Sequence, residues 1–174
     1  VLAGAPGLAV ALAMALAMAS VHASSGAGDE AIWLRVDTES ESLVVIRDGA
    51  VVERLEGISV GRGGVRADRE RGDESTPRGT FRIRWVNEDS PYYRFYGFDY
   101  PTEAHAARAW LDGRIDRATY ERIAAASAAG SVPPQDTVLG GQLGIHGLGP
   151  GDVKTHQRYH WTRGCIAVTN EQLD

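Results

Sequence analysis

The sequence has a single cysteine, Cys165, and a single lysine, Lys154, among its 174 residues. A lone cysteine excludes an internal disulfide, so its thiol is either inert or kept for reactivity. Basic residues are also in deficit, because 18 lysines and arginines face 23 acidic residues and leave a formal net charge of −5. This balance argues against a general nucleic-acid-binding protein, which usually carries a basic footprint.

The first residues lack charge altogether. Residues 8–19 are an uninterrupted apolar run, and Val21-His22-Ala23 has the small-x-small pattern of a signal peptidase site. We predict a signal peptide at 1–23, a flexible linker at 24–30, and export to the periplasm or cell envelope. The alternative is a retained membrane anchor, because the apolar stretch nearly reaches the ~20 residues that a membrane span requires. Contact with a membrane is expected only if this segment stays uncleaved.

The next part of the chain reads as an antiparallel meander. Alternating apolar residues predict strands over 32–36 and 43–46. Asp48-Gly49 is a two-residue hairpin signal, and residues 50–55 form the returning strand. Residues 66–74 are almost all charged, and we expect them to form an exposed loop.

The middle of the chain holds the only helical region that the pattern predicts. Residues 103–111 and 117–129 are expected to be two short helices, with Gly130 ending the second. Strands are expected again at 81–85 and at 143–146. These elements predict an α+β fold that is mainly β, with a helical insert that packs beside the functional groove and forms a wall of it.

Cys165 shares one segment of the chain with three histidines. His146, His156 and His160 all lie upstream of it, within the reach of one loop. A cysteine near histidines is a candidate nucleophile, because an imidazole can take the proton of the thiol. Gly164 lets the backbone approach closely, so the amides of Gly164 and Cys165 are candidates for an oxyanion hole.

Two motifs in this order resemble the YkuD-type catalytic domain of the L,D-transpeptidases. The family signature is His-Gly, a variable loop, and Ser/Thr-x-Gly-Cys with an apolar residue, matched by His146-Gly147 and by Thr162 to Ile166. A second family stretch is matched by Gly72-Asp73, Thr76-Pro77, Gly79 and Phe81. The details look closest to the YafK-like branch, through Leu139-Gly140-Gly141 and Trp161 to Ala167.

The resemblance implies a mixed β-sandwich or barrel with an active-site groove at the end of a sheet. It assigns residues 31–174 to the catalytic domain, which looks truncated at the C-terminus beside its relatives. It also implies a cysteine acyltransferase that acts on peptidoglycan stem peptides and needs no metal or cofactor. Cys165 attacks the carbonyl on the L-centre of the third stem residue and expels the terminal D-alanine, which leaves a thioester. Acylation by carbapenem-type β-lactams follows from the same chemistry.

The acceptor in the second step decides the product. Another stem peptide gives a 3→3 cross-link, and a protein lysine gives an anchored protein. Water gives net hydrolysis, which is the alternative reading as an L,D-carboxypeptidase or amidase. The sequence does not choose among these three acceptors.

The resemblance also gives each residue of the segment a role. His146 is the base, and a carbonyl at Gly147 orients its imidazole. Thr162 fixes the turn before the cysteine by side-chain hydrogen bonds. Arg163 favours the thiolate, binds a substrate carboxylate, or is a solvated arginine without a role in the site. Trp161 and His160 are expected on the substrate side of the groove.

Two alternatives of other classes remain open. His146, His156, His160 and Cys165 are four plausible zinc ligands in one segment, although no tight ligand pair is present. A non-catalytic wall-binding module on the same scaffold is the second alternative. Replacing Cys165 separates it from an enzyme, because a binding module keeps its function without the thiol.

Overall fold

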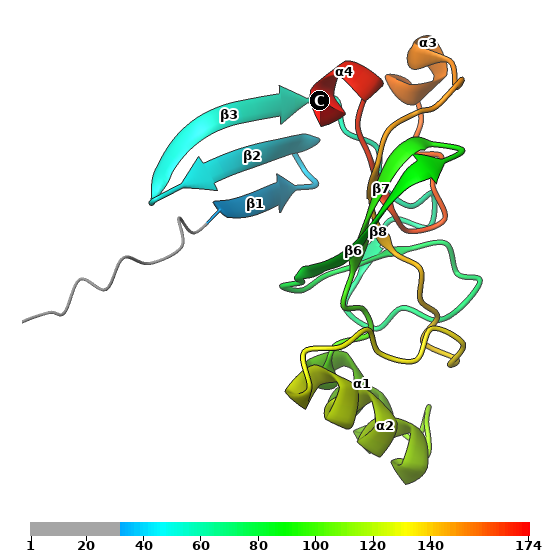
Figure 1. Cartoon of the computed structure of the whole chain (residues 1–174). Coiled ribbons are helices and arrows are strands. Elements are labelled where there is room, and N and C mark those ends of the chain that lie inside the picture. The colour runs from blue at the N-terminus through cyan, green and yellow to red at the C-terminus, as the bar shows by residue number, and fades with distance from the viewer. Residues whose placement is uncertain (1–31) are drawn as a thin grey trace, which may run out of the picture. The chain divides into compact units, whose positions relative to one another are not determined.

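The computed structural model describes residues 32–174, so the predicted signal peptide and linker lie outside the described residues. Within this range the chain forms three sheets and four helices (Figure 1). The protein is therefore mainly β with a few helices, as the sequence predicts.

The first sheet is the expected meander. Its strands are β1 (Ile32–Asp37), β2 (Ser42–Arg47) and β3 (Ala50–Glu56), paired antiparallel in that order. Asp48 and Gly49 both have positive φ angles, 51° and 79°, which is the backbone that a tight hairpin with right-handed strand twist requires. Only the central strand is well covered, because Leu43 and Val44 are buried whereas most of β1 and β3 is exposed.

A short parallel pair follows, formed by β4 (Val65–Arg66) and β5 (Thr76–Pro77). The loop between them is not exposed throughout, which corrects the expectation for residues 66–74. Arg69 is only 5% exposed. Its guanidinium fits beside Gly140 and Gly164, where the absence of side chains leaves room for it.

The third sheet carries the segment with the family signature. Its order is β6 (Ile83–Ser90), β7 (Tyr93–Phe98), β8 (Gly144–His146) and β9 (Ile166–Ala167). The first two pairings are antiparallel and the last, β8 with β9, is parallel. The main core lies between this sheet and the meander, and it is formed by Leu43, Ile58, Phe98, Tyr100, Leu143, Ile145, Ile166 and Val168.

The helical insert consists of α1 (Glu103–Leu111) and α2 (Arg117–Ala128). The bounds of α1 are as predicted. Helix α2 ends one residue earlier than predicted: its C-cap is Ala129, and Gly130 follows with a φ of +63°. Ala106, Ala109, Ile115, Ile123 and Leu139 give the pair a small core of its own.

Helices are not confined to the insert, which corrects the prediction of a single helical region. The short α3 (Val153–His156) and α4 (Asn170–Leu173) lie at the opposite end of Figure 1 from α1 and α2. Thr169 and Gln172 form a capping box at the start of α4. The Gln172 side chain also donates to the Glu56 carbonyl at 2.9 Å, which ties α4 to β3.

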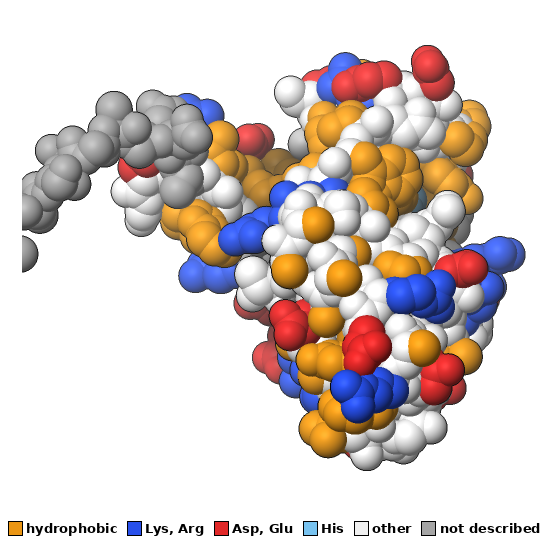
Figure 2. Space-filling view, turned by 60° about the horizontal axis from the view of Figure 1, so that its bottom comes forward, with side chains coloured by type: hydrophobic (Ala, Val, Ile, Leu, Met, Phe, Trp, Pro, Cys, Tyr) orange, Lys and Arg blue, Asp and Glu red, His pale blue; other side chains and the backbone are white. Residues whose placement is uncertain are grey.

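The face shown in Figure 2 mixes basic, acidic and apolar side chains, without a broad area of one charge. Within residues 32–174, none of the helices has the length and apolar character needed to span a bilayer.

Candidate active site

The parallel pairing of β8 with β9 brings the two signature motifs together. Ile145 lies opposite Ile166, and His146 lies opposite Ala167. Continued by one residue, this register places Cys165 across from Gly144. The pairing therefore brings the backbone of Cys165, which immediately precedes β9, alongside the strand that ends at His146.

His146 is held in one orientation by its own turn. It is 3% exposed, and its Nδ1 lies 2.7 Å from the Gly147 carbonyl oxygen. A carbonyl only accepts, so Nδ1 carries the proton and Nε2 keeps its lone pair. Burial lowers the pKa of His146, so the imidazole is neutral at neutral pH. The rings of Tyr92 and Trp161 pack against it, with centroid distances of 4.7 and 5.7 Å.

Asn170 fixes the turn that orients this imidazole, and sequence reasoning missed it. Its Oδ1 accepts from the amides of Leu148 and Gly149 at 2.8 and 3.1 Å. Its Nδ2 donates to the Gly149 carbonyl at 3.0 Å. A Cβ on Gly147 would lie 2.6 Å from Oδ1, so only glycine fits there. The available sequence signal was the Thr169-to-Gln172 capping box, which marks a helix start at this position.

The thiol of Cys165 is partly buried and packs against the main core. It donates to the Gln142 carbonyl at 3.6 Å, and the hydrogen bonds of the described residues include none between Cys165 and His146. Burial raises the pKa of Cys165 to about 11. A backbone hydrogen bond from Gly144 and the positive charge of Arg69 both lower this pKa, but by less. Desolvation therefore penalises the thiolate more than these two neighbours stabilise it.

Thr162 makes the hydrogen bonds expected of it. Its hydroxyl donates to the Cys165 carbonyl at 2.6 Å and accepts from the Gly164 amide at 3.2 Å. The Gly164 amide is thus already engaged, which removes it from the predicted oxyanion hole and leaves the Cys165 amide as the candidate. Gly164 has a φ of +122°, a conformation that favours glycine.

The second family stretch builds the support beneath this turn. Thr76 accepts a hydrogen bond from the Gly61 amide at 2.8 Å, and Gly61 forms a bridge with Thr162. A Cβ on Gly164 would lie 2.5 Å from the Ser75 carbonyl oxygen. The Gly-Asp and Thr-Pro residues therefore act on the site by holding the backbone that surrounds the cysteine.

The remaining predicted residues are divided between the site and its surroundings. Arg163 is exposed, and its charge acts on Glu74. Trp161 lies beside His146 and donates through Nε1 to His156 at 3.2 Å. His160 faces another way, because Nδ1 accepts from the Val60 amide at 3.4 Å and Nε2 lies 3.4 Å from a Glu41 oxygen.

A mostly apolar pocket of about 400 Å³ adjoins the imidazole. Tyr92 and Trp161, whose rings pack against His146, also line this pocket. The rest of its lining includes Leu148, Pro150, Thr155 and His156. None of its lining residues comes from α1 or α2, which pack on a core of their own around Leu139. That the helical insert forms a wall of the groove stays a prediction.

The four candidate zinc ligands do not converge. His146, His156 and His160 each direct a ring nitrogen to a different protein group. Among residues 32–174, no three side chains of the metal-binding types are grouped so that they could hold an ion.

Comparison with known protein families agrees with this geometry. The family profile of the YkuD L,D-transpeptidase catalytic domain matches residues 31–174. The chain belongs to the YkuD family. No curated protein and no solved structure gives a significant match.

The YkuD match covers both signature motifs and the meander that precedes them. The protein is therefore an L,D-transpeptidase-type catalytic domain, a class whose general substrates are the stem peptides of peptidoglycan. Its assignment to the YafK-like branch stays a prediction from the residues around the two motifs.

Proposed function

We propose that this YkuD domain is a cysteine acyltransferase that cleaves and rejoins peptidoglycan stem peptides through a Cys165 thioester. The observation that carries the proposal is the 2.7 Å bond from His146 Nδ1 to the Gly147 carbonyl oxygen. It leaves Nε2 unprotonated and free to act as the base for the thiol that precedes the neighbouring strand. The third group of a catalytic triad is then a backbone carbonyl instead of a carboxylate.

The protonation states of the pair define the first step. A neutral thiol faces a neutral imidazole, because burial disfavours charge on both. The thiol proton therefore passes to His146 Nε2 as Sγ attacks the substrate carbonyl carbon. Catalytic hydrogen bonds are often long in an unliganded site and tighten when substrate binds.

The developing oxyanion is taken by the Cys165 amide, and His146 then returns its proton to the departing D-alanine amine. An acceptor amine attacks the thioester, gives its proton to His146, and releases the thiol. The apolar pocket lined by Tyr92 and Trp161 lies next to the base, where it offers apolar surface to either the donor or the acceptor peptide. With a stem peptide as acceptor, the product is a 3→3 cross-link.

The test is intact-mass analysis after incubation with a carbapenem and, in a separate sample of untreated protein, incubation with a stem tetrapeptide. Wild type is expected to gain the mass of one carbapenem, and Cys165→Ala to gain none. With the tetrapeptide, wild type is expected to form a dimer with loss of alanine. An adduct on Cys165→Ala, or no adduct on a folded wild type, contradicts the proposal.

The same incubation separates the alternatives. Loss of alanine without a dimer identifies water as the acceptor and the domain as a hydrolase. Peptidoglycan binding that is equal in wild type and Cys165→Ala, without any turnover, identifies a binding module. Export of the chain is tested separately, by N-terminal sequencing of the protein recovered from cells for cleavage after Ala23.

A further inference from the structure

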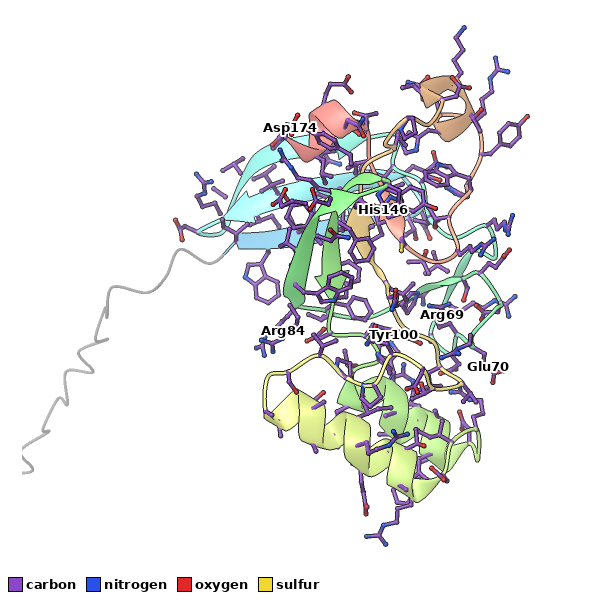
Figure 3. The ribbon with its side chains drawn as sticks, turned by 45° about the vertical axis from the view of Figure 1, so that its right-hand side comes forward. Arg69, Glu70, Arg84, Tyr100, His146 and Asp174 are labelled. Carbon is purple, nitrogen blue, oxygen red and sulfur yellow. The ribbon has the colours of Figure 1, made fainter. Side chains whose placement is uncertain are left out.

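Arg69 is a buried charge next to the proposed nucleophile. It lies on the loop between β4 and β5, yet it is 5% exposed. A Cβ on Gly164 would lie 3.4 Å from its Nη1, and a Cβ on Gly140 would lie 3.6 Å from its Nη2. Its Cζ is 5.6 Å from the centre of the Tyr100 ring (Figure 3). The guanidinium thus lies among two glycines and an aromatic ring, and one of these glycines, Gly164, immediately precedes Cys165.

The guanidinium lacks the partners that a buried arginine usually has. Nε and Nη1 are both buried and have no hydrogen-bond acceptor among the described residues. The Asp73 carboxylate is 3.7 Å from Nε, but its oxygens already accept from Ser75 and from the Glu70 amide. Arginine does not lose its proton in proteins, so a full positive charge persists here. Buried donors left unpaired are rare and call for an explanation.

The neighbour that gains from this charge is the thiol. Burial makes ionisation of Cys165 unfavourable, and Arg69 is the charged side chain that lowers its pKa against that effect. We propose that Arg69 is a positioning residue whose fixed charge stabilises the negative sulfur of Cys165 as the thiol proton leaves for His146. This inference rests on the proposed function only in taking Cys165 as the nucleophile.

The charge acts through space and not by binding substrate. Nε and Nη1 are inaccessible, so a substrate carboxylate cannot reach them. Charges buried in protein are screened far less by water and salt than charges at the surface. Because the guanidinium has no close hydrogen-bonded ion pair, its positive charge still acts on neighbouring groups such as the thiol. A tight ion pair would cancel most of that effect.

Other ionisable groups surround the same sulfur. On β8, His146 is neutral at neutral pH because burial lowers its pKa. On the cysteine's own segment, Arg163 is exposed and acts on Glu74. On the loop between β4 and β5, Asp73 faces Arg69 and partly offsets its charge. Removing Arg69 and removing Asp73 should therefore have opposite effects on the thiol.

The experiment measures the alkylation rate of Cys165 by iodoacetamide as a function of pH, read by intact mass. Cys165 is the only cysteine, so each added mass reports this one site. For Arg69→Met, the pH midpoint is expected to rise by about one unit, which lowers the rate at pH 8 by about tenfold. For Arg69→Lys, the shift should be smaller because a positive charge is retained. Arg66→Met is the matched control, because Arg66 is exposed on the same part of the chain, and its midpoint should equal that of wild type.

Asp73→Asn provides the opposite test and remains usable if Arg69→Met does not fold. Its midpoint should fall below that of wild type. A folded Arg69→Met with an unchanged midpoint overturns the proposal, as does Asp73→Asn with a midpoint at or above wild type. A shift in Arg69→Lys as large as that in Arg69→Met also overturns it, because shape and not charge would then be responsible. Alkylation needs no peptide substrate, so these results are independent of whether the domain performs acyl transfer.

Discussion

The two sides of the proposed active site satisfy their polar groups in different ways. Around His146, the Gly147 carbonyl holds the imidazole, and the Asn170 amide makes three hydrogen bonds to the turn that follows. Around Cys165, a guanidinium is buried with two nitrogens unpaired. The imidazole side is thus built to fix geometry, whereas the thiol side retains a charge that Asp73 offsets only in part. Hydrogen bonds position a base, but only an unpaired charge gives a field that extends beyond its nearest partner.

The largest effect is expected from removing the base on the imidazole side. His146→Gln keeps a polar side chain of similar size but cannot accept the thiol proton. The rate of carbapenem acylation should fall by about 10²- to 10⁴-fold, the usual contribution of a general base. Mass spectrometry over a time course measures it. His160→Gln is the control and should acylate at nearly the wild-type rate, because the ring nitrogens of His160 face Val60 and Glu41. Wild-type acylation by His146→Gln would show that another group takes the proton.

On the thiol side, the turn that precedes Cys165 is disrupted most directly by replacing Thr162. Thr162→Val removes the hydroxyl that pairs with the Gly164 amide and the Cys165 carbonyl, at a residue that is 3% exposed. The free energy of unfolding should fall by about 1–3 kcal/mol, the cost of leaving buried polar groups unpaired. Urea denaturation measures this change. Thr162→Ser keeps the hydroxyl and should lose less than half as much, and equal losses in both variants would assign the effect to the methyl group.

A finer change on the imidazole side is Asn170→Asp. The carboxylate still accepts from Leu148 and Gly149 but cannot donate to the Gly149 carbonyl. Loss of one hydrogen bond predicts a decrease of about 0.5–1.5 kcal/mol in the free energy of unfolding. Because Asn170 acts through the turn, the tautomer of His146 should become mixed, which ¹⁵N NMR of the imidazole detects. Asn87→Ala, which removes an exposed side-chain hydrogen bond to the Asp89 amide in β6, should leave the tautomer unchanged. An unmixed tautomer in Asn170→Asp would limit Asn170 to a structural role.

The smallest effect is a change in stability with pH. Burial lowers the pKa of His146 below its usual 6.5, so the unfolded state binds the proton more readily than the folded state. Stability should therefore decrease as the pH falls below 6.5 towards the lowered value. Urea denaturation at pH 8 and pH 5 should show a smaller loss in His146→Gln than in wild type. Some loss should remain, because burial also lowers the pKa of His105 and His156. Identical losses in both proteins would contradict the assignment.

Local patterns predicted the regular elements well. The alternation of apolar residues and the Asp48-Gly49 turn gave the meander, and helix α1 has the predicted bounds. The helices α3 and α4 were missed because each is a single short turn without a periodic apolar face. Both start at capping residues, Asp152 and Thr169, and these were the only local signal available.

The site was predictable as far as it consists of motifs. His146 ends β8, and the turn that holds Thr162 and Cys165 leads directly into the neighbouring β9. Arg69 and Asn170 were not predicted, because one is a charged residue in a charged loop and the other is a single amide after the last strand. Their roles depend on contacts with Gly164, Leu148 and Gly149 that exist only in the folded chain.

The sequence by itself determined the family, the meander and the two helices of the insert, and it predicted the thiol and the imidazole, because these follow from local spacing and from motifs. Only the tertiary structure decided the electrostatics of the pair. The ionisation of a side chain depends on how much water is removed from it and on which charges lie nearby. Burial of Cys165 and of Arg69 results from packing between segments that are distant in the chain, and no local pattern of residues encodes it.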